Sequence, residues 1–170
     1  MSDVAKSKEL LKRYSIARIP FIAVNTIERA RTLDILKEIA EELALPFYVH
    51  TLSKGLYDLT TEKVINDDKS VYGAIDFMSE QMKRKQYMTL ILTEVPDLSG
   101  DNSDSKQILD LVTLANESGG VVIVLTNHAI WNQLQRLGMV IKIDLPNEDE
   151  MYAIIKEYID DSVSYTHLRA

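Results

Sequence analysis

The chain has 170 residues, a formal net charge of −7 and no cysteine. Its length is enough for one domain with a sizeable core, and the lack of cysteine excludes disulfides and thiolate catalysis. The acidic balance argues against nucleic acid as the main partner, because no broad basic face is available to neutralise phosphates. No segment approaches the roughly 18 apolar residues of a membrane span, and the N-terminus lacks a signal-peptide pattern. We therefore expect a cytoplasmic protein with no membrane partner.

The first third of the chain predicts a helix, a strand, a longer helix and a second strand. Ser2–Tyr14 has the composition of a short charged helix, and Ile19–Val24 is an apolar run of strand length. From Asn25 to about Ala44 the apolar residues recur at helical spacing. Leu45–Leu52 is again largely apolar and predicts the second strand.

The middle of the chain begins with a polar connection. Ser53–Asp68 predicts a surface loop with at most a short turn of helix. Ser70 is expected to cap the next helix, whose last turn carries the basic run Lys83–Lys85. A third strand is predicted over Tyr87–Glu94. The acidic loop Asp97–Ser105 follows it and lacks the ligand spacing of an EF-hand, so we interpret it as a solvated loop.

The last third of the chain continues the alternation of helices and strands. Helical spacing marks a helix around Ile108–Ala115, and Val121–Thr126 is the strongest β-forming run. A short helix over Ala129–Leu137 and a fifth strand over Met139–Leu145 come next. Asn147 is expected to cap a final helix. The apolar residues of that helix that we expect to face the core are Met151, Ile154, Ile155, Tyr158 and Ile159.

Strands that alternate with helices, and that are apolar along most of their length, indicate a parallel sheet covered by helices on both faces. The sequence therefore predicts an α/β fold. No internal repeat or linker divides it into two domains.

The first strand-to-helix junction is where nucleotide-binding α/β proteins often keep a phosphate loop. Such a loop needs Gly, four variable residues, Gly-Lys and then Ser or Thr. Asn25–Thr32 keeps this spacing and the final Thr, but Asn25 and Ala30 replace the glycines and Arg31 replaces the lysine. Glycine lets backbone N–H groups turn inward around an anion without a Cβ in the way. The residues present therefore do not predict a working phosphate cradle.

A second interpretation of the same junction is a helix N-terminus. Asn25 or Thr26 could cap the helix directly, with Glu28 completing a capping-box pattern. Glu28 would then place a negative charge where the helix dipole favours phosphate. Both interpretations stay open here: a cap, or a loop that still holds nucleotide through Arg31 and Thr32.

Three places together resemble the core of an AAA-type ATPase. The junction at Asn25–Thr32 is in register with a Walker A loop that has lost its glycines and lysine. Leu90–Glu94 is similar to a Walker B strand, although it ends in Thr-Glu where the family has Asp-Glu. Val122–His128 is similar to the sensor 1 strand, whose Asn orients the attacking water and corresponds here to Asn127.

A further passage, Lys142–Glu150, closely resembles the basic-Leu-Pro-acidic segment that ends the large AAA subdomain. The resemblance spans about Ile19–Ile159. It implies a P-loop NTPase-like three-layer α/β/α sandwich with a five-stranded, mainly parallel sheet in the order 5-1-4-3-2. We accordingly expect an N-terminal helix over 1–17 and a degenerate AAA-like α/β domain over 18–161.

The chemistry of the family is not implied by this sequence. Phosphoryl transfer depends on positioned phosphates, a bound magnesium and an oriented water. The phosphate-holding residues are absent, and Thr93 replaces the Asp that helps hold magnesium. We therefore predict no catalytic residue and no metal ligand. What the resemblance leaves is a vestigial nucleotide site of Arg31, Thr32, Glu94 and Asn127, although a strand-end acid and a loop-forming Asn would equally account for the last two.

Some AAA proteins carry a degenerate N-terminal ATPase-like domain ahead of an intact one, and this chain resembles that first half. The resemblance implies a non-catalytic module that regulates or scaffolds a following ATPase domain in a homo-oligomer. ATP and magnesium would belong to the full-length parent and not to this chain. Two alternatives stay open: a weak ATP-binding or ATP-hydrolysing enzyme, and a free-standing adaptor that binds another protein through Ser53–Asp68 and Asp97–Ser105.

The tail Val163–Ala170 does not continue the helical pattern, and it resembles the translation of the transposase end sequence used in sequencing libraries. We therefore expect 162–170 to be non-native, with a genuine disordered tail as the alternative, and the natural protein to depart from this chain at about Asp161. Re-reading the source DNA from a library made without transposase separates the two. A frame that continues into Gly-x-x-x-x-Gly-Lys-Thr supports the first, and a stop codon directly after Ala170 contradicts it.

Overall fold

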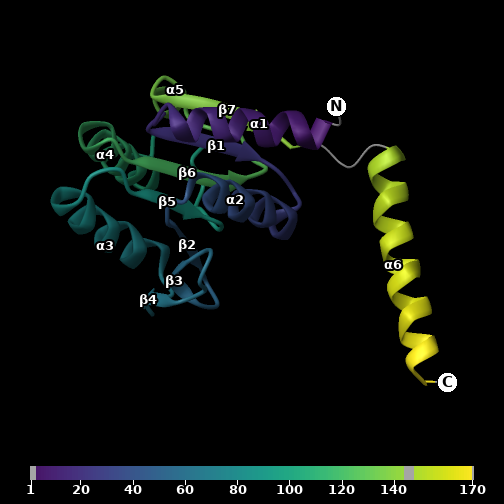
Figure 1. The fold of residues 1–170 in the computed structure, drawn as a ribbon. Helices are drawn as coiled ribbons and strands as arrows, with labels where there is room; N and C mark the ends of the chain where they lie inside the picture. Colours follow the sequence, from purple (N-terminus) through teal and green to yellow (C-terminus); the bar gives the residue numbers. More distant parts are fainter. Residues whose placement is uncertain (1–2, 144–147, 170) are drawn as a thin grey trace.

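The computed structural model describes residues 3–143 and 148–169 and is built around a sheet of seven strands (Figure 1). Along the chain the elements are α1 (Asp3–Ile16), β1 (Phe21–Asn25), α2 (Arg29–Leu43), β2 (Phe47–Thr51), β3 (Gly55–Asp58), β4 (Val64–Asn66), α3 (Val71–Arg84), β5 (Thr89–Leu92), α4 (Ser103–Ser118), β6 (Val121–Thr126), α5 (Asn132–Gln135), β7 (Gly138–Lys142) and α6 (Glu148–Arg169).

The strands lie in the order β4-β3-β2-β5-β6-β1-β7. The strands β7, β1, β6, β5 and β2 are parallel neighbours, and they follow the predicted order 5-1-4-3-2. The α/β fold and the order of its parallel core are therefore confirmed. The count of five strands is wrong, because β3 and β4 extend the sheet beyond β2 as antiparallel strands.

The two additional strands lie in the segment Ser53–Asp68, for which we had expected a loop. Gly55 has φ +79, and a Cβ on it would lie 2.5 Å from the carbonyl oxygen of Asn66, so glycine allows the chain to turn back closely here. Leu56 and Tyr57 are then buried along β2. The strands have only four and three residues, which is too short for a periodic pattern to reveal them.

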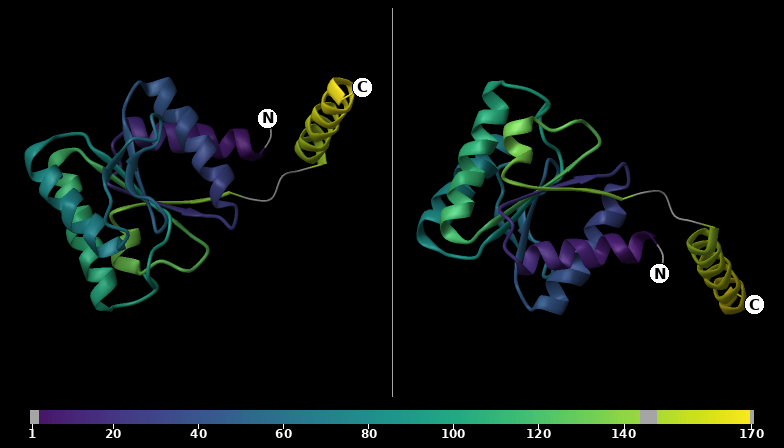
Figure 2. Two further views of the ribbon diagram at one scale, coloured as in Figure 1. Left: turned by 90° about the horizontal axis from the view of Figure 1, so that it is seen from below. Right: turned by 90° about the horizontal axis from the view of Figure 1, so that it is seen from above.

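Helices cover both faces of the sheet (Figure 2). Along β1, Phe21 and Ala23 belong to the core under α3 and α4, whereas Ile22 and Val24 belong to the core under α1 and α2. All four side chains are at most 1% exposed. A strand that is buried on both faces reads as a continuous apolar run, and this is why β1 could be recognised in the sequence.

The first helix is anchored to the second. Leu11 is fully buried, and the ammonium group of Lys8 lies 2.7 Å from one carboxylate oxygen of Glu42. Hydrogen bonds from Lys8 and Lys12 lower the pKa of Glu42, and the bond to Glu42 raises the pKa of Lys8. The contribution of this carboxylate to stability is therefore present above its unfolded pKa and is lost as the pH falls through the lowered folded value.

The beginnings of the helices differ partly from the prediction. α2 begins at Arg29 with Glu28 at the N-cap position and no side-chain cap, so the capping box expected from Asn25 is wrong. Asn25 is instead the last residue of β1. Ser70 caps α3 as predicted, by accepting a hydrogen bond from the backbone N–H of Tyr72 at 3.2 Å.

Helix α4 begins inside the segment that we had predicted as an acidic loop. Asn102 caps it by accepting a hydrogen bond from the N–H of Ser105 at 2.8 Å. The helix ends at Ser118, and Gly119 follows as its C-cap with a left-handed φ of +68, a conformation that glycine adopts readily. The short helix predicted over Ala129–Leu137 is the single turn α5, Asn132–Gln135.

The last helix does not face the core, contrary to the prediction. Every side chain of α6 that the structure describes is exposed, including Tyr158 at 75% and Ile155 at 51%. The helix also runs to Arg169, beyond the point where the helical pattern of the sequence stops. The predicted cap Asn147 lies outside the described residues. Among the described helices, none has the length and apolarity needed to cross a membrane.

Candidate functional site

A cavity of about 350 Å³ opens at the carboxyl ends of β1, β5 and β6. Its polar lining comes from the residues that follow each strand: Thr26 after β1, Thr93 and Glu94 after β5, and Asn127 and His128 after β6. Ligands of open α/β sheets characteristically bind at this end of the strands. The cavity is therefore our candidate functional site.

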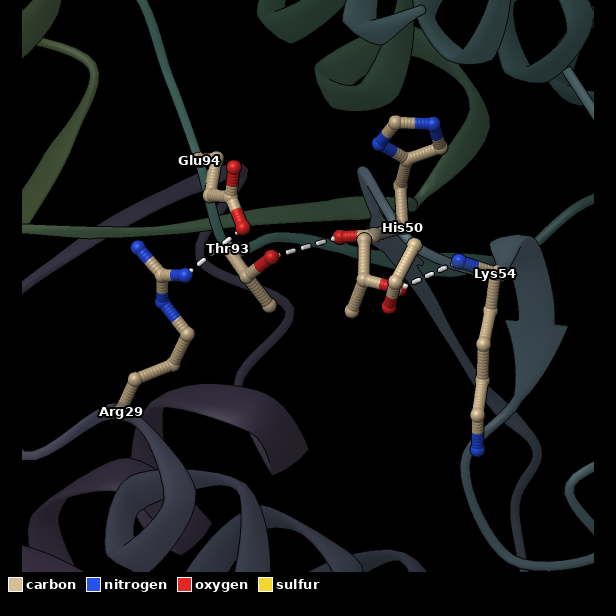
Figure 3. Close-up of polar contacts among 7 residues, drawn as sticks. Arg29, His50, Lys54, Thr93 and Glu94 are labelled. Atoms are coloured by element: carbon tan, nitrogen blue, oxygen red, sulfur yellow. Dashed lines mark hydrogen bonds and ion pairs between the residues drawn. The ribbon is translucent and has the colours of Figure 1, made fainter. Parts of the chain in front are cut away.

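An ion pair lies across the candidate site (Figure 3). The guanidinium of Arg29, the first residue of α2, donates to a carboxylate oxygen of Glu94 at 2.7 Å. The two side chains are 50% and 30% exposed, so water has access to the pair. Arg29 is thus held by a carboxylate of the protein at the start of the helix, the end at which helices favour bound anions.

Thr93, which the family resemblance aligns with the Walker B aspartate, is 1% exposed. Its hydroxyl donates to the carbonyl oxygen of His50 at 2.8 Å, which ties the end of β5 to β2 (Figure 3). The His50 ring is itself buried, and its Nε2 lies 3.0 Å from the carbonyl oxygen of Asp68. The threonine therefore has a structural partner and supplies no carboxylate to the cavity.

The four residues of the predicted nucleotide site do not come together. Glu94 and Asn127 line the cavity, but Arg31 and Thr32 do not. Thr32 is fully buried and donates its hydroxyl to the carbonyl oxygen of Glu28 at 2.9 Å. The nearest guanidinium nitrogen of Arg31 lies 3.6 Å from a carboxylate oxygen of Glu28.

Sequence reasoning missed Arg29, Thr26 and His128 as lining residues. Thr26 accepts a hydrogen bond from the N–H of Glu28 at 3.0 Å, which forms a tight turn ahead of α2. The sequence did contain a signal for this turn, because a threonine side chain often accepts a hydrogen bond from the backbone N–H two residues later. Using that signal would have placed the start of the helix at Arg29 instead of Asn25.

A second cavity of about 440 Å³ adjoins the first and shares Val95 and His128 with it. Asp97 lines this second cavity, and hydrogen bonds from the hydroxyl and the N–H of Ser99 lower the pKa of its carboxyl group, with a smaller contribution from His128. The candidate site therefore extends from the first cavity over the loop that carries Asp97.

These residues do not match what Mg²⁺-ATP requires. The junction lacks glycines and the lysine, and the nearest arginine already has a carboxylate partner. Within residues 3–143 and 148–169, no three His, Asp or Glu side chains gather closely enough to hold a metal ion. We accordingly derive no phosphoryl-transfer step from this site.

The ion pair is expected to contribute little to stability, because both partners are partly hydrated. Replacing Arg29 with Met or Glu94 with Gln should change the free energy of unfolding by less than about 1 kcal/mol. Urea denaturation measures this. Lys106→Met is the matched control, because its partner Asp101 lies at 3.4 Å and both side chains are more than 60% exposed. A loss above about 2 kcal/mol for either variant would show that the pair is structural.

Comparisons with known proteins agree with the fold. Residues 7–143 match the family described as SpoVK-like AAA ATPase, N-terminal domain. A chain of the E. coli MS115-1 HORMA:CdnC:Trip13 complex is similar with a TM-score of 0.58 and 10% identity, over 94% of this chain and 68% of that one. No curated protein sequence matches the chain. Since the family match covers most of its length, the chain belongs to the SpoVK-like AAA ATPase N-terminal domain family.

Proposed function

We propose that this chain is a non-catalytic ATPase-like module that regulates or scaffolds a following, intact ATPase domain. The observation that carries the proposal is the ion pair between Arg29 and Glu94, which closes the position of the phosphate loop with a carboxylate. The family description, an N-terminal domain of an AAA ATPase, supports the same role.

The electrostatics of the site support the absence of nucleotide binding. Phosphate needs unpaired positive charge and free backbone N–H groups at the helix start. Here the N–H of Glu28 is taken by Thr26, and the carboxylates of Glu28 and Glu94 lie beside the two arginines of the junction. Binding a triphosphate would place its charge against these carboxylates.

The test is a titration of Mg²⁺-ATP against the whole chain, followed by melting temperature and by calorimetry. We expect no shift at millimolar nucleotide. Nucleotide present at about 100 times its Kd would stabilise the protein by about 2.7 kcal/mol, so a Kd of about 10 μM would give a large shift at millimolar nucleotide. A dissociation constant below about 1 mM would overturn the proposal.

A weak nucleotide-binding enzyme is the second candidate, because Glu94 and Asn127 do line one cavity. It predicts binding that Asn127→Ala weakens at least about tenfold, a change of about 1.4 kcal/mol. Asn132→Ala, in α5 and outside the cavity lining, is the matched control. The adaptor alternative predicts no nucleotide effect in any variant.

A further inference from the structure

The candidate site holds one positive and one negative side chain that face each other in a cavity. The guanidinium of Arg29 and the carboxylate of Glu94 lie 2.7 Å apart, and both residues line the cavity of about 350 Å³ (Figure 3). An ion pair to which water has access is weak, because water solvates both charges when they separate. A ligand that offers each of the two groups a new partner can therefore open this pair at a small cost.

The two sides of the pair favour ligand groups of opposite charge. Arg29 is the first residue of α2, a helix of 15 residues that begins without a side-chain cap, and the start of a helix favours a negative group. Glu94 comes from a different element, the end of β5, and its carboxylate favours a positive group. A single ligand that satisfies both side chains must carry an anionic and a cationic group.

The two charges of such a ligand have to be close together. The contact between Arg29 and Glu94 is short, and both residues are anchored at the ends of regular elements that meet at this cavity. An α-amino acid carries its ammonium and its carboxylate on one carbon atom, so its two charges diverge from a common point. A ligand with its charges at opposite ends of a long chain would need the two side chains to move far apart.

The apolar part of the lining indicates what the remainder of the ligand is. Ile27, Val95 and Leu125 line the cavity beside the ion pair, and Ile27 is 71% exposed. An aliphatic ligand side chain would cover this surface and remove it from water. The volume of the cavity lies at the lower end of the range for small-molecule sites, which suits a ligand of few atoms.

The balance of charge distinguishes this ligand from nucleotide. Arg29 and Glu94 offset each other, and Glu28 adds a further carboxylate beside Arg31 at the same junction. A triphosphate would bring several negative charges against these carboxylates. A zwitterion brings no net charge, so the feature that disfavours phosphate does not disfavour an amino acid.

We propose that the candidate site binds a free α-amino acid with an aliphatic side chain of about the size of leucine. Its carboxylate pairs with Arg29, its ammonium pairs with Glu94, and its side chain packs on Ile27 and Val95. This inference rests on the proposed function, because it makes the ligand the signal that a module without nucleotide chemistry passes to the ATPase domain that it regulates.

The test is a calorimetric titration of the whole chain with L-leucine. We expect a dissociation constant below about 1 mM. Three analogues separate the contributions: isocaproate lacks the ammonium, isoamylamine lacks the carboxylate, and ε-aminocaproate carries both charges at opposite ends of its chain. Each analogue should bind at least about tenfold more weakly than leucine.

Arg29→Met and Glu94→Gln each remove one charge of the pair and should weaken leucine binding at least about tenfold. Lys106→Met and Asp101→Asn are the matched controls, because they remove the same charges from an exposed ion pair that lines neither cavity of the candidate site. They should leave binding unchanged. Urea denaturation of the same variants shows that a loss of binding is not a loss of the fold.

The absence of heat and of a shift in melting temperature at about 10 mM leucine would overturn the inference. Isocaproate or isoamylamine that binds as tightly as leucine would also overturn it, as would an Arg29 or Glu94 variant with wild-type affinity. A chain that binds neither leucine nor Mg²⁺-ATP overturns this inference and leaves the proposed function standing. A chain that binds Mg²⁺-ATP overturns both.

Discussion

Replacing Gly138 with alanine is expected to disrupt the pairing of β7 with β1 and to lower the free energy of unfolding by about 3 kcal/mol or more. A Cβ at this position would lie 1.7 Å from the carbonyl oxygen of Phe21 and 2.6 Å from its carbonyl carbon. Both are backbone atoms of the neighbouring strand, paired with Gly138 in register. They cannot rotate away, so the strand itself would have to move.

Gly100→Ala is the matched control. A Cβ there would meet no atom within 4 Å, so we expect a change of less than about 0.5 kcal/mol or a slight stabilisation. Urea denaturation followed by the fluorescence of Trp131, the single tryptophan, measures both variants. A Gly138→Ala protein with wild-type stability would show that β7 does not lie against β1 as described.

Restoring the Walker B aspartate by Thr93→Asp is expected to destabilise the protein by about 3–5 kcal/mol instead of creating a magnesium site. Thr93 is 1% exposed, and its hydroxyl donates to the carbonyl oxygen of His50. A charged carboxylate would meet that carbonyl as a second acceptor, with Glu94 as a negative neighbour. A buried charge without a partner carries a large desolvation cost.

Thr93→Val separates the loss of the hydroxyl donor from the burial of a charge, because valine keeps the shape of threonine and removes only the donor. We expect it to cost about 1 kcal/mol, the usual net contribution of one hydrogen bond, because the backbone N–H of Thr93 still donates to the same carbonyl oxygen at 3.4 Å. Urea denaturation gives both values, and a magnesium titration of the Asp variant tests for the metal. An Asp variant that is as stable as wild type and binds magnesium would show that this expectation is wrong.

The departures from the ATPase pattern are connected to one another in the structure. Arg29 pairs with Glu94, Thr93 bonds to His50, and Thr32 bonds to the backbone of Glu28. Each of Arg29, Thr93 and Thr32 therefore has a partner inside the domain. Recovery of a phosphate site would require several of these contacts to be broken together.

Elements with a long local pattern were predictable from the sequence. The strand β6 has the predicted bounds, and β1 was recognised because alternate side chains enter the two cores on either side of the sheet. The helix α3, its serine cap and its basic last turn were likewise predictable. The strand order came from the family resemblance and not from the pattern, because no local signal encodes which strands are neighbours.

The alternation of apolar strands and amphipathic helices is encoded locally, because it depends on spacing within a few residues. The candidate site and the edges of the sheet depend instead on contacts between distant parts of the chain. Arg29 and Glu94 are 65 residues apart, and β3 and β4 are strands only because they pair with β2. The exposure of α6 was decided in the same way, because its apolar stripe shows only that it needs a partner and not where that partner lies. Long-range contacts set these features, and they leave no periodic trace in the residues that make them.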